Sequence, residues 1–104
     1  AILFDDIIDT GGTIAAASRA LIERGAKSVS VAATHGIFSD ESVEKLKDTP
    51  IDEIIVTDTL KQNGNIEKIG NVKILSVSSI IATALTSIFA DDSVSAIFMG
   101  ENVL

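Results

Sequence analysis

The sequence predicts an α/β fold built on a doubly wound, mostly parallel sheet. Apolar segments of strand length alternate with helical segments along the chain. Residues 51–56 form a largely apolar segment, which is typical of a buried parallel strand. Two adjacent glycines separate the first apolar segment from the first helical one, at a position where α/β proteins bind anions.

The first half of the chain predicts strand, helix, strand. Residues 1–4 form an apolar strand, and residues 14–24 have apolar side chains at helical spacing. Gly25 is a natural residue to end that helix, because glycine readily takes the left-handed conformation. Residues 27–33 then alternate serine with valine, which predicts a second strand.

The second half continues the alternation. Pro50 ends a short charged helix and precedes the third strand. A polar segment then predicts a flexible crossover loop, and the last long helix carries an apolar stripe suited to a core or a subunit interface. The expected ranges are 40–48 (helix), 51–56 (strand), 61–71 (loop), 72–77 (strand), 78–90 (helix) and 94–98 (a last strand).

Composition narrows the class of protein. A chain of 104 residues fits one domain, and 46% hydrophobic residues indicate surfaces covered by partner subunits or a neighbouring domain, so a homo-oligomer is expected. A net charge of −7 argues against nucleic-acid binding. The lack of cysteine fits a cytoplasmic protein, and no apolar run is long enough to predict a membrane span. The first residue, Ala1, suggests a piece of a longer gene product.

The turn after the first strand predicts a phosphate site. Gly11 and Gly12 allow backbone N–H groups to converge at the positive end of the following helix, and Thr10 and Thr13 add hydroxyl donors. The alternative is an ordinary turn in which Asp9 or Thr13 only caps the helix.

Acidic residues beside this turn make the predicted site more specific. Asp5, Asp6 and Asp9 would repel a bare phosphate, so either a divalent cation or sugar hydroxyls must offset their charge. A sugar phosphate together with Mg²⁺ supplies both.

Residues 5–13, Asp-Asp-Ile-Ile-Asp-Thr-Gly-Gly-Thr, resemble the phosphoribosyl pyrophosphate (PRPP) motif of the phosphoribosyltransferase fold. Two further segments look like signatures of the ribose-phosphate pyrophosphokinase, or PRPP synthetase, family, and residues 92–98 are similar to its C-terminal segment. The two signatures are Ala-Thr-His-Gly-Ile-Phe-Ser at 33–39 and Ile-Val-Thr-Asp-Thr at 55–59.

The resemblance implies both an activity and a division of roles. The family transfers a diphosphoryl group from ATP to ribose 5-phosphate with Mg²⁺. Residues 10–13 would hold the 5-phosphate, and Asp5 and Asp6 would bind the ribose hydroxyls and the metal ion. Asp9 would lie near the sugar as the candidate catalytic residue, with its role as a base left open.

The resemblance also implies that much of the active site lies elsewhere. Residues 1–104 match the later part of the second of two phosphoribosyltransferase-like domains, so the ATP-binding residues and the mobile catalytic loop are expected outside this sequence. The chain alone should then retain part of a ribose 5-phosphate pocket and make no PRPP.

Three other functions remain open at this stage. A base-transferring phosphoribosyltransferase would share residues 5–13, but usually lacks the other two signatures. A phosphoacceptor module would use Asp58, but no lysine follows Lys73 to complete its site. A noncatalytic assembly module would use the apolar helix. His35 invites a catalytic role, but a lone histidine beside a glycine turn is more often structural.

Overall fold

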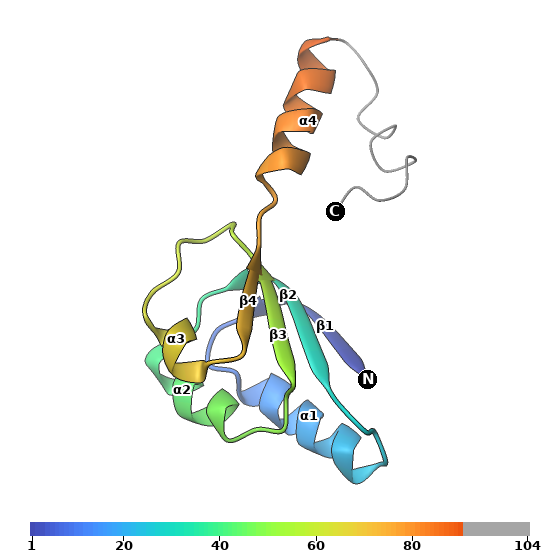
Figure 1. Ribbon diagram of the computed structural model, residues 1–104, viewed down its shortest axis with the longest axis vertical. Coiled ribbons are helices and arrows are strands. Elements are labelled where there is room, and N and C mark those ends of the chain that lie inside the picture. The colour runs from blue at the N-terminus through green and yellow to red at the C-terminus, as the bar shows by residue number, and fades with distance from the viewer. Residues whose placement is uncertain (91–104) are drawn as a thin grey trace.

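A computed structural model describes residues 1–90, which form four strands and four helices in strict alternation (Figure 1). Their order is β1 (Ile2–Ile8), α1 (Gly12–Glu23), β2 (Ser30–Gly36), α2 (Asp40–Lys47), β3 (Glu53–Thr57), α3 (Asn65–Ile69), β4 (Val72–Leu75) and α4 (Ser78–Phe89). Within residues 1–90 no helix is long and apolar enough to cross a membrane. The predicted strand at 94–98 lies outside the described residues.

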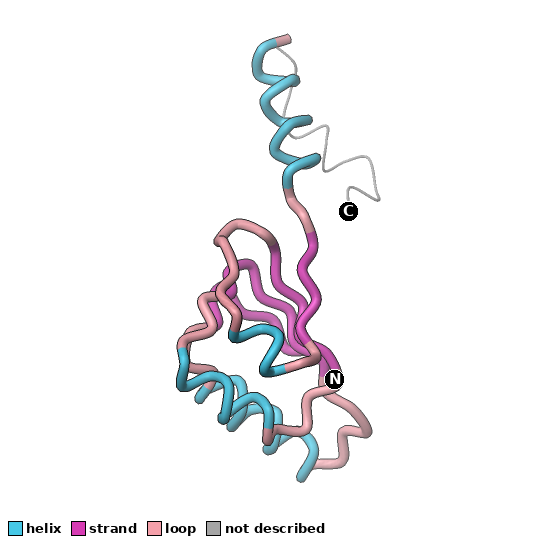
Figure 2. Tube along the Cα trace, turned by 60° about the vertical axis from the view of Figure 1, so that its left-hand side comes forward, coloured by secondary structure: helices cyan, strands magenta, loops and turns pink. Residues whose placement is uncertain are grey.

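The four strands form one parallel sheet in the order β1-β2-β3-β4. Each strand is added on the same side of the one before it. Right-handed crossovers therefore place the connecting helices on one face of the sheet. Figure 2 shows α1, α2 and α3 on that face. The parallel α/β fold is confirmed, and among residues 1–90 no helix covers the second face.

The hydrophobic core lies between the sheet and these three helices. Val31, Ile54 and Val56 come from the central strands and are fully buried, and Leu46 of α2 packs against them. Phe38, in the loop after β2, is the largest fully buried side chain of the described residues. This core fixes the ends of the strands from which the candidate site is built.

The first strand is longer than predicted. It continues to Ile8, so Asp5 and Asp6 lie within β1 rather than in the loop. Pairing with β2 explains the extension, because Asp5 lies opposite Ala33 and Ile8 opposite Gly36. Helix α1 also begins two residues before the predicted start, at Gly12.

The prediction of a loop throughout residues 61–71 is wrong. This segment contains α3, and both Asn65 and Ile69 are buried. Ile69 joins the hydrophobic core, which stabilises a five-residue helix that its own sequence would not. The segment is therefore a packed crossover.

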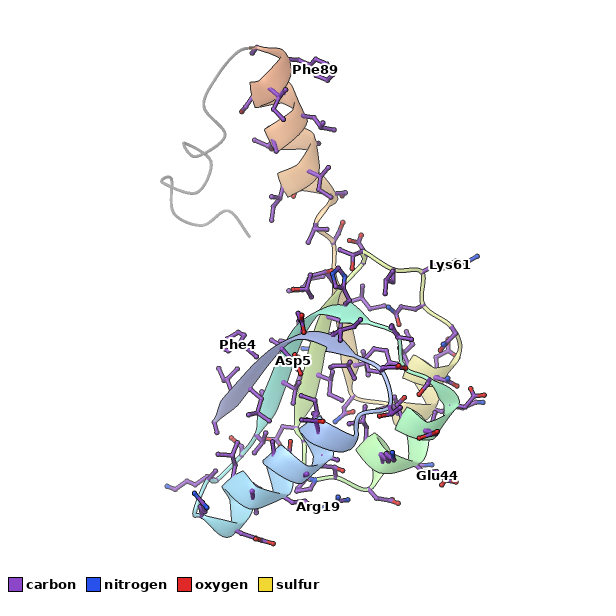
Figure 3. The ribbon with its side chains drawn as sticks, turned by 180° about the vertical axis from the view of Figure 1, so that it is seen from behind. Phe4, Asp5, Arg19, Glu44, Lys61 and Phe89 are labelled. Carbon is purple, nitrogen blue, oxygen red and sulfur yellow. The ribbon has the colours of Figure 1, made fainter. Side chains whose placement is uncertain are left out.

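The second face of the sheet is open and carries an apolar row beside the Lys73–Glu53 ion pair. Phe4, Ala32 and Ile55 lie side by side in the register of β1, β2 and β3. The Phe4 side chain is 80% exposed, and Figure 3 shows it projecting outward from β1. Helix α4 extends beyond β4 with no buried residue, so its predicted apolar stripe is also exposed (Figure 1).

Candidate functional site

A cavity of about 260 Å³ lies at the carboxyl end of β1. Its walls come from the end of β1, the turn that follows and the first turn of α1. Five predicted site residues line it together with three isoleucines: Asp5, Asp9, Thr10, Gly11 and Thr13, with Ile7, Ile8 and Ile14. Asp6 and Gly12, which were also predicted, are not among the lining residues.

The start of α1 has the form of an anion site. Gly11 has φ 81°, and a Cβ atom there would lie 2.9 Å from Cγ of Leu46, so both conformation and space favour glycine. No side chain caps the helix, and its first turn has no acidic residue. The first N–H groups of α1 are therefore left for a ligand. The capping alternative for Asp9 or Thr13 is not seen.

Lys45 is a candidate site residue that sequence reasoning missed. Its ammonium group lies 3.6 Å from the position that a Cβ atom on Gly12 would take, and 3.3 Å from a carboxylate oxygen of Glu41. The sequence predicts only a short charged helix at 40–48, and no local pattern distinguishes Lys45 within it. Only the packing of α2 against the turn, through Leu46, brings this positive charge beside the glycines.

Comparison with known proteins identifies the family. A protein-family model, described as the phosphoribosyl synthetase-associated domain, matches residues 1–99. The chain belongs to this family. The domain is 47% identical over 97 residues to a ribose-phosphate pyrophosphokinase from Buchnera aphidicola, and 46% identical over 97 residues to one from Haemophilus influenzae. Each match covers 93% of this chain and 31% of the relative.

A solved structure shows the same relationship. The crystal structure of phosphoribosylpyrophosphate synthetase from Mycobacterium smegmatis superposes on this chain with a TM-score of 0.78 and 42% sequence identity. The match covers 86% of this chain and 30% of that chain. The resemblance to the pyrophosphokinases is thus confirmed, and the domain spans under a third of their length.

The carboxylates in the cavity of this chain are suited to Mg²⁺ only if a ligand supplies further oxygens. Asp5 and Asp9 both line the cavity, but Asp5 Oδ1 already accepts a hydrogen bond from the backbone N–H of Asp6 (2.7 Å). No group of three or more metal-binding side chains occurs within residues 1–90. Mg²⁺ commonly binds one or two carboxylates together with substrate phosphates and water, and this donor set fits that pattern.

The two segments that resemble the family's other signatures contact each other. Nδ1 of His35 and Oγ1 of Thr59 share a hydrogen bond of 2.7 Å, and the Thr57 hydroxyl donates to the Thr34 carbonyl (2.6 Å). These bonds join the carboxyl ends of β2 and β3. They support the interpretation of His35 as a structural residue. His35 is not among the residues that line the cavity.

Asp58 joins the end of β3 to the start of α4. Its Oδ1 accepts a hydrogen bond from the Val77 N–H (2.9 Å). This bond, and after it a bond from the Ser76 hydroxyl, lower the pKa of the Asp58 carboxyl. The carboxylate is thus engaged by the backbone, so the geometry gives no support to a phosphoacceptor role.

Proposed function

We propose that this domain supplies the ribose 5-phosphate site of a ribose-phosphate pyrophosphokinase. That enzyme would transfer a diphosphoryl group from ATP to the 1-hydroxyl of ribose 5-phosphate. The names of the relatives support the activity and favour it over base transfer. The observation that carries the proposal for this chain is the uncapped start of α1 beside a cavity with two carboxylates.

The phosphate end of the ligand belongs at residues 10–13. Backbone N–H groups at the start of α1 would bind the 5-phosphate, with hydroxyl donors from Thr10 and Thr13. Lys45 would add a positive charge from the neighbouring helix. These groups together offset the acidic residues nearby.

The sugar end belongs at the carboxylates. Asp5 and Asp9 line the cavity and would accept hydrogen bonds from the ribose hydroxyls or bind Mg²⁺ through the bound substrate. The metal would neutralise charge that develops during transfer. Asp9 would position the sugar, which makes it the candidate catalytic residue. The expected role of Asp6 beside Asp5 in metal binding stays a prediction.

The whole protein's remaining features are part of the same proposal. ATP would bind residues outside this chain, so residues 1–104 alone would make no PRPP. A C-terminal position in the second domain and a cytoplasmic location stay predictions. A homo-oligomer is supported by the open apolar face at Phe4, Ala32 and Ile55.

The test is an NMR titration of this chain with ribose 5-phosphate, with and without Mg²⁺. We expect saturable shifts centred on the amides of Gly11, Gly12 and Thr13, and weaker shifts with ribose alone. Lys45→Gln should weaken binding about two- to fivefold, because it removes a partly exposed charge near the phosphate.

The matched control is Lys47→Gln, on the same helix and exposed to solvent. It should leave the dissociation constant unchanged. Equal shifts with ribose and with ribose 5-phosphate would contradict a phosphate site at α1. PRPP formed by the purified chain would contradict the assignment of half an active site.

A further inference from the structure

The turn that carries the candidate site is held by the loop after β2. Backbone N–H groups of Ile37 and Phe38 both donate to the Ile8 carbonyl, at 2.8 and 3.2 Å. The N–H and hydroxyl of Ser39 donate to the Asp9 carbonyl, at 3.1 and 3.2 Å. Residues 36–39, here called the bracing loop, thus fix the two carbonyl groups that immediately precede Thr10.

The bracing loop has a backbone conformation that must itself be held. Phe38 has φ 50°, which is a left-handed backbone conformation. For a residue with a side chain, this conformation costs on the order of 1 kcal/mol or more. Its ring is fully buried against Gly36, where a Cβ atom would lie 2.5 Å from the ring. Other contacts must therefore stabilise this conformation.

Three side-chain amides provide those contacts. Gln62 donates to the Gly36 carbonyl at 3.0 Å, and Asn63 donates to the carbonyls of Ile37 and Phe38 at 3.3 and 3.2 Å. Asn65 donates to the Phe38 carbonyl at 2.8 Å. Gln62 and Asn63 lie in the loop after β3, and Asn65 is the first residue of α3.

Asn65 is the central member of this set. It is 6% exposed, and its Nδ2 atom also donates to Oδ1 of Asp40 at 3.0 Å. One buried amide therefore joins α3 to the bracing loop and to the first residue of α2. The Phe38 carbonyl that it satisfies belongs to the residue with the left-handed backbone.

We infer that Asn65 is a positioning residue for the candidate site, acting through the bracing loop on the turn at Asp9 and Thr10. Its amide holds Phe38, and the N–H groups on either side of that residue hold the carbonyls of Ile8 and Asp9. This inference rests on the proposed binding of ribose 5-phosphate. Asn65 would therefore affect ligand affinity although it does not line the cavity.

The test compares Asn65→Ala with Asn71→Ala in this chain. Asn71 also donates its side-chain amide to a backbone carbonyl, that of Ile51, at 2.6 Å, but near the amino ends of β3 and β4. Both variants should lower the melting temperature. Asn65→Ala alone should raise the dissociation constant for ribose 5-phosphate about three- to tenfold, because a smaller fraction of molecules then holds the turn in the binding conformation.

Hydrogen exchange gives a second measurement that needs no ligand. The amides of Ile37, Phe38 and Ser39 should exchange faster in Asn65→Ala than in Asn71→Ala. If Asn65→Ala does not fold, Gln62→Ala can replace it in both measurements. This variant removes a neighbouring, less buried amide, so the same effects should be seen but should be weaker.

The outcomes separate the two proposals. Equal affinity and equal exchange in the two asparagine variants would overturn the positioning role of Asn65. If the unmodified chain does not bind ribose 5-phosphate, the proposed function fails, and the exchange rates alone decide whether Asn65 holds the bracing loop.

Discussion

At the scale of single residues, two buried serines differ in one respect that predicts opposite effects on stability. Ser18 of α1 and Ser42 of α2 are both fully buried. The Ser18 hydroxyl has no hydrogen-bond partner, whereas the Ser42 hydroxyl donates to the Ser39 carbonyl at 2.7 Å. A buried hydroxyl without a partner costs free energy, and one with a partner does not.

Ser18→Ala should therefore raise the free energy of unfolding by about 0.5–1 kcal/mol, helped by the higher helix propensity of alanine. Ser42→Ala should lower it by about 1 kcal/mol. Urea unfolding of the three proteins, followed by circular dichroism, measures both changes. Destabilisation by Ser18→Ala equal to that by Ser42→Ala would show that the Ser18 hydroxyl has a partner in solution.

The candidate site could be predicted residue by residue only where the signal was local. Asp5, Asp9 and the glycine turn are consecutive or nearly so, and their chemistry is legible in sequence. Lys45 and Asn65 reach the site region through tertiary packing of α2 and α3. Nothing in their local sequence distinguishes them from solvent-facing residues of a charged helix and a polar loop.

At the scale of elements, Asp58 ties the start of α4 to the sheet in a way that depends on pH. Hydrogen bonds from the Val77 N–H and the Ser76 hydroxyl lower its pKa below the usual value of 3.8. A carboxyl with a lowered pKa in the folded state stabilises that state above its ordinary pKa. This contribution is lost as pH falls through the lowered pKa.

We expect the Val77 amide resonance to titrate with a midpoint below 3.8, measured by NMR between about pH 2 and 6. Asp58→Asn should abolish this titration, because an amide does not ionise. A midpoint at or above 3.8 would contradict the lowered pKa of Asp58, and the same titration in Asp58→Asn would mean that Val77 reports another group.

Element boundaries show where sequence periodicity is a weak guide. The predicted positions of α1, α2 and α4 were close, because each has a regular apolar pattern, and Gly25 and Pro50 mark the ends of the first two. Helix α3 was missed because five residues are too few to show a period. The extension of β1 to Ile8 depends on pairing with β2, which the acidic residues at 5 and 6 do not reveal.

At the scale of the whole molecule, the sheet has one covered and one open face. All-parallel sheets normally have both faces covered, so the row of exposed Phe4 and half-buried Ala32 and Ile55 is expected to associate with another surface. The order of strands along the chain predicted the parallel sheet. The order of strands did not predict that the second face would be left uncovered by every helix within residues 1–90.

Phe4→Ser should reduce self-association of this chain, because it removes the most exposed large side chain of the open face (80% exposed). Sedimentation velocity over a range of concentrations measures the change. Leu60→Ser is the matched control, since Leu60 is 40% exposed but lies in the loop after β3. Equal association of both variants and the unmodified chain would exclude this face as the contact.

The order of the strands also bears on how the chain acquires its structure during synthesis. Among residues 1–90, β2, β3 and β4 each pair with the strand synthesised just before them, so none of the three has to wait for a distant partner. The pairing of β1 with β2 requires nothing beyond Gly36, and the glycine turn lies between them. The backbone around the candidate phosphate loop is completed later, because the loop at 37–39 that holds it depends on Asn65, which follows β3.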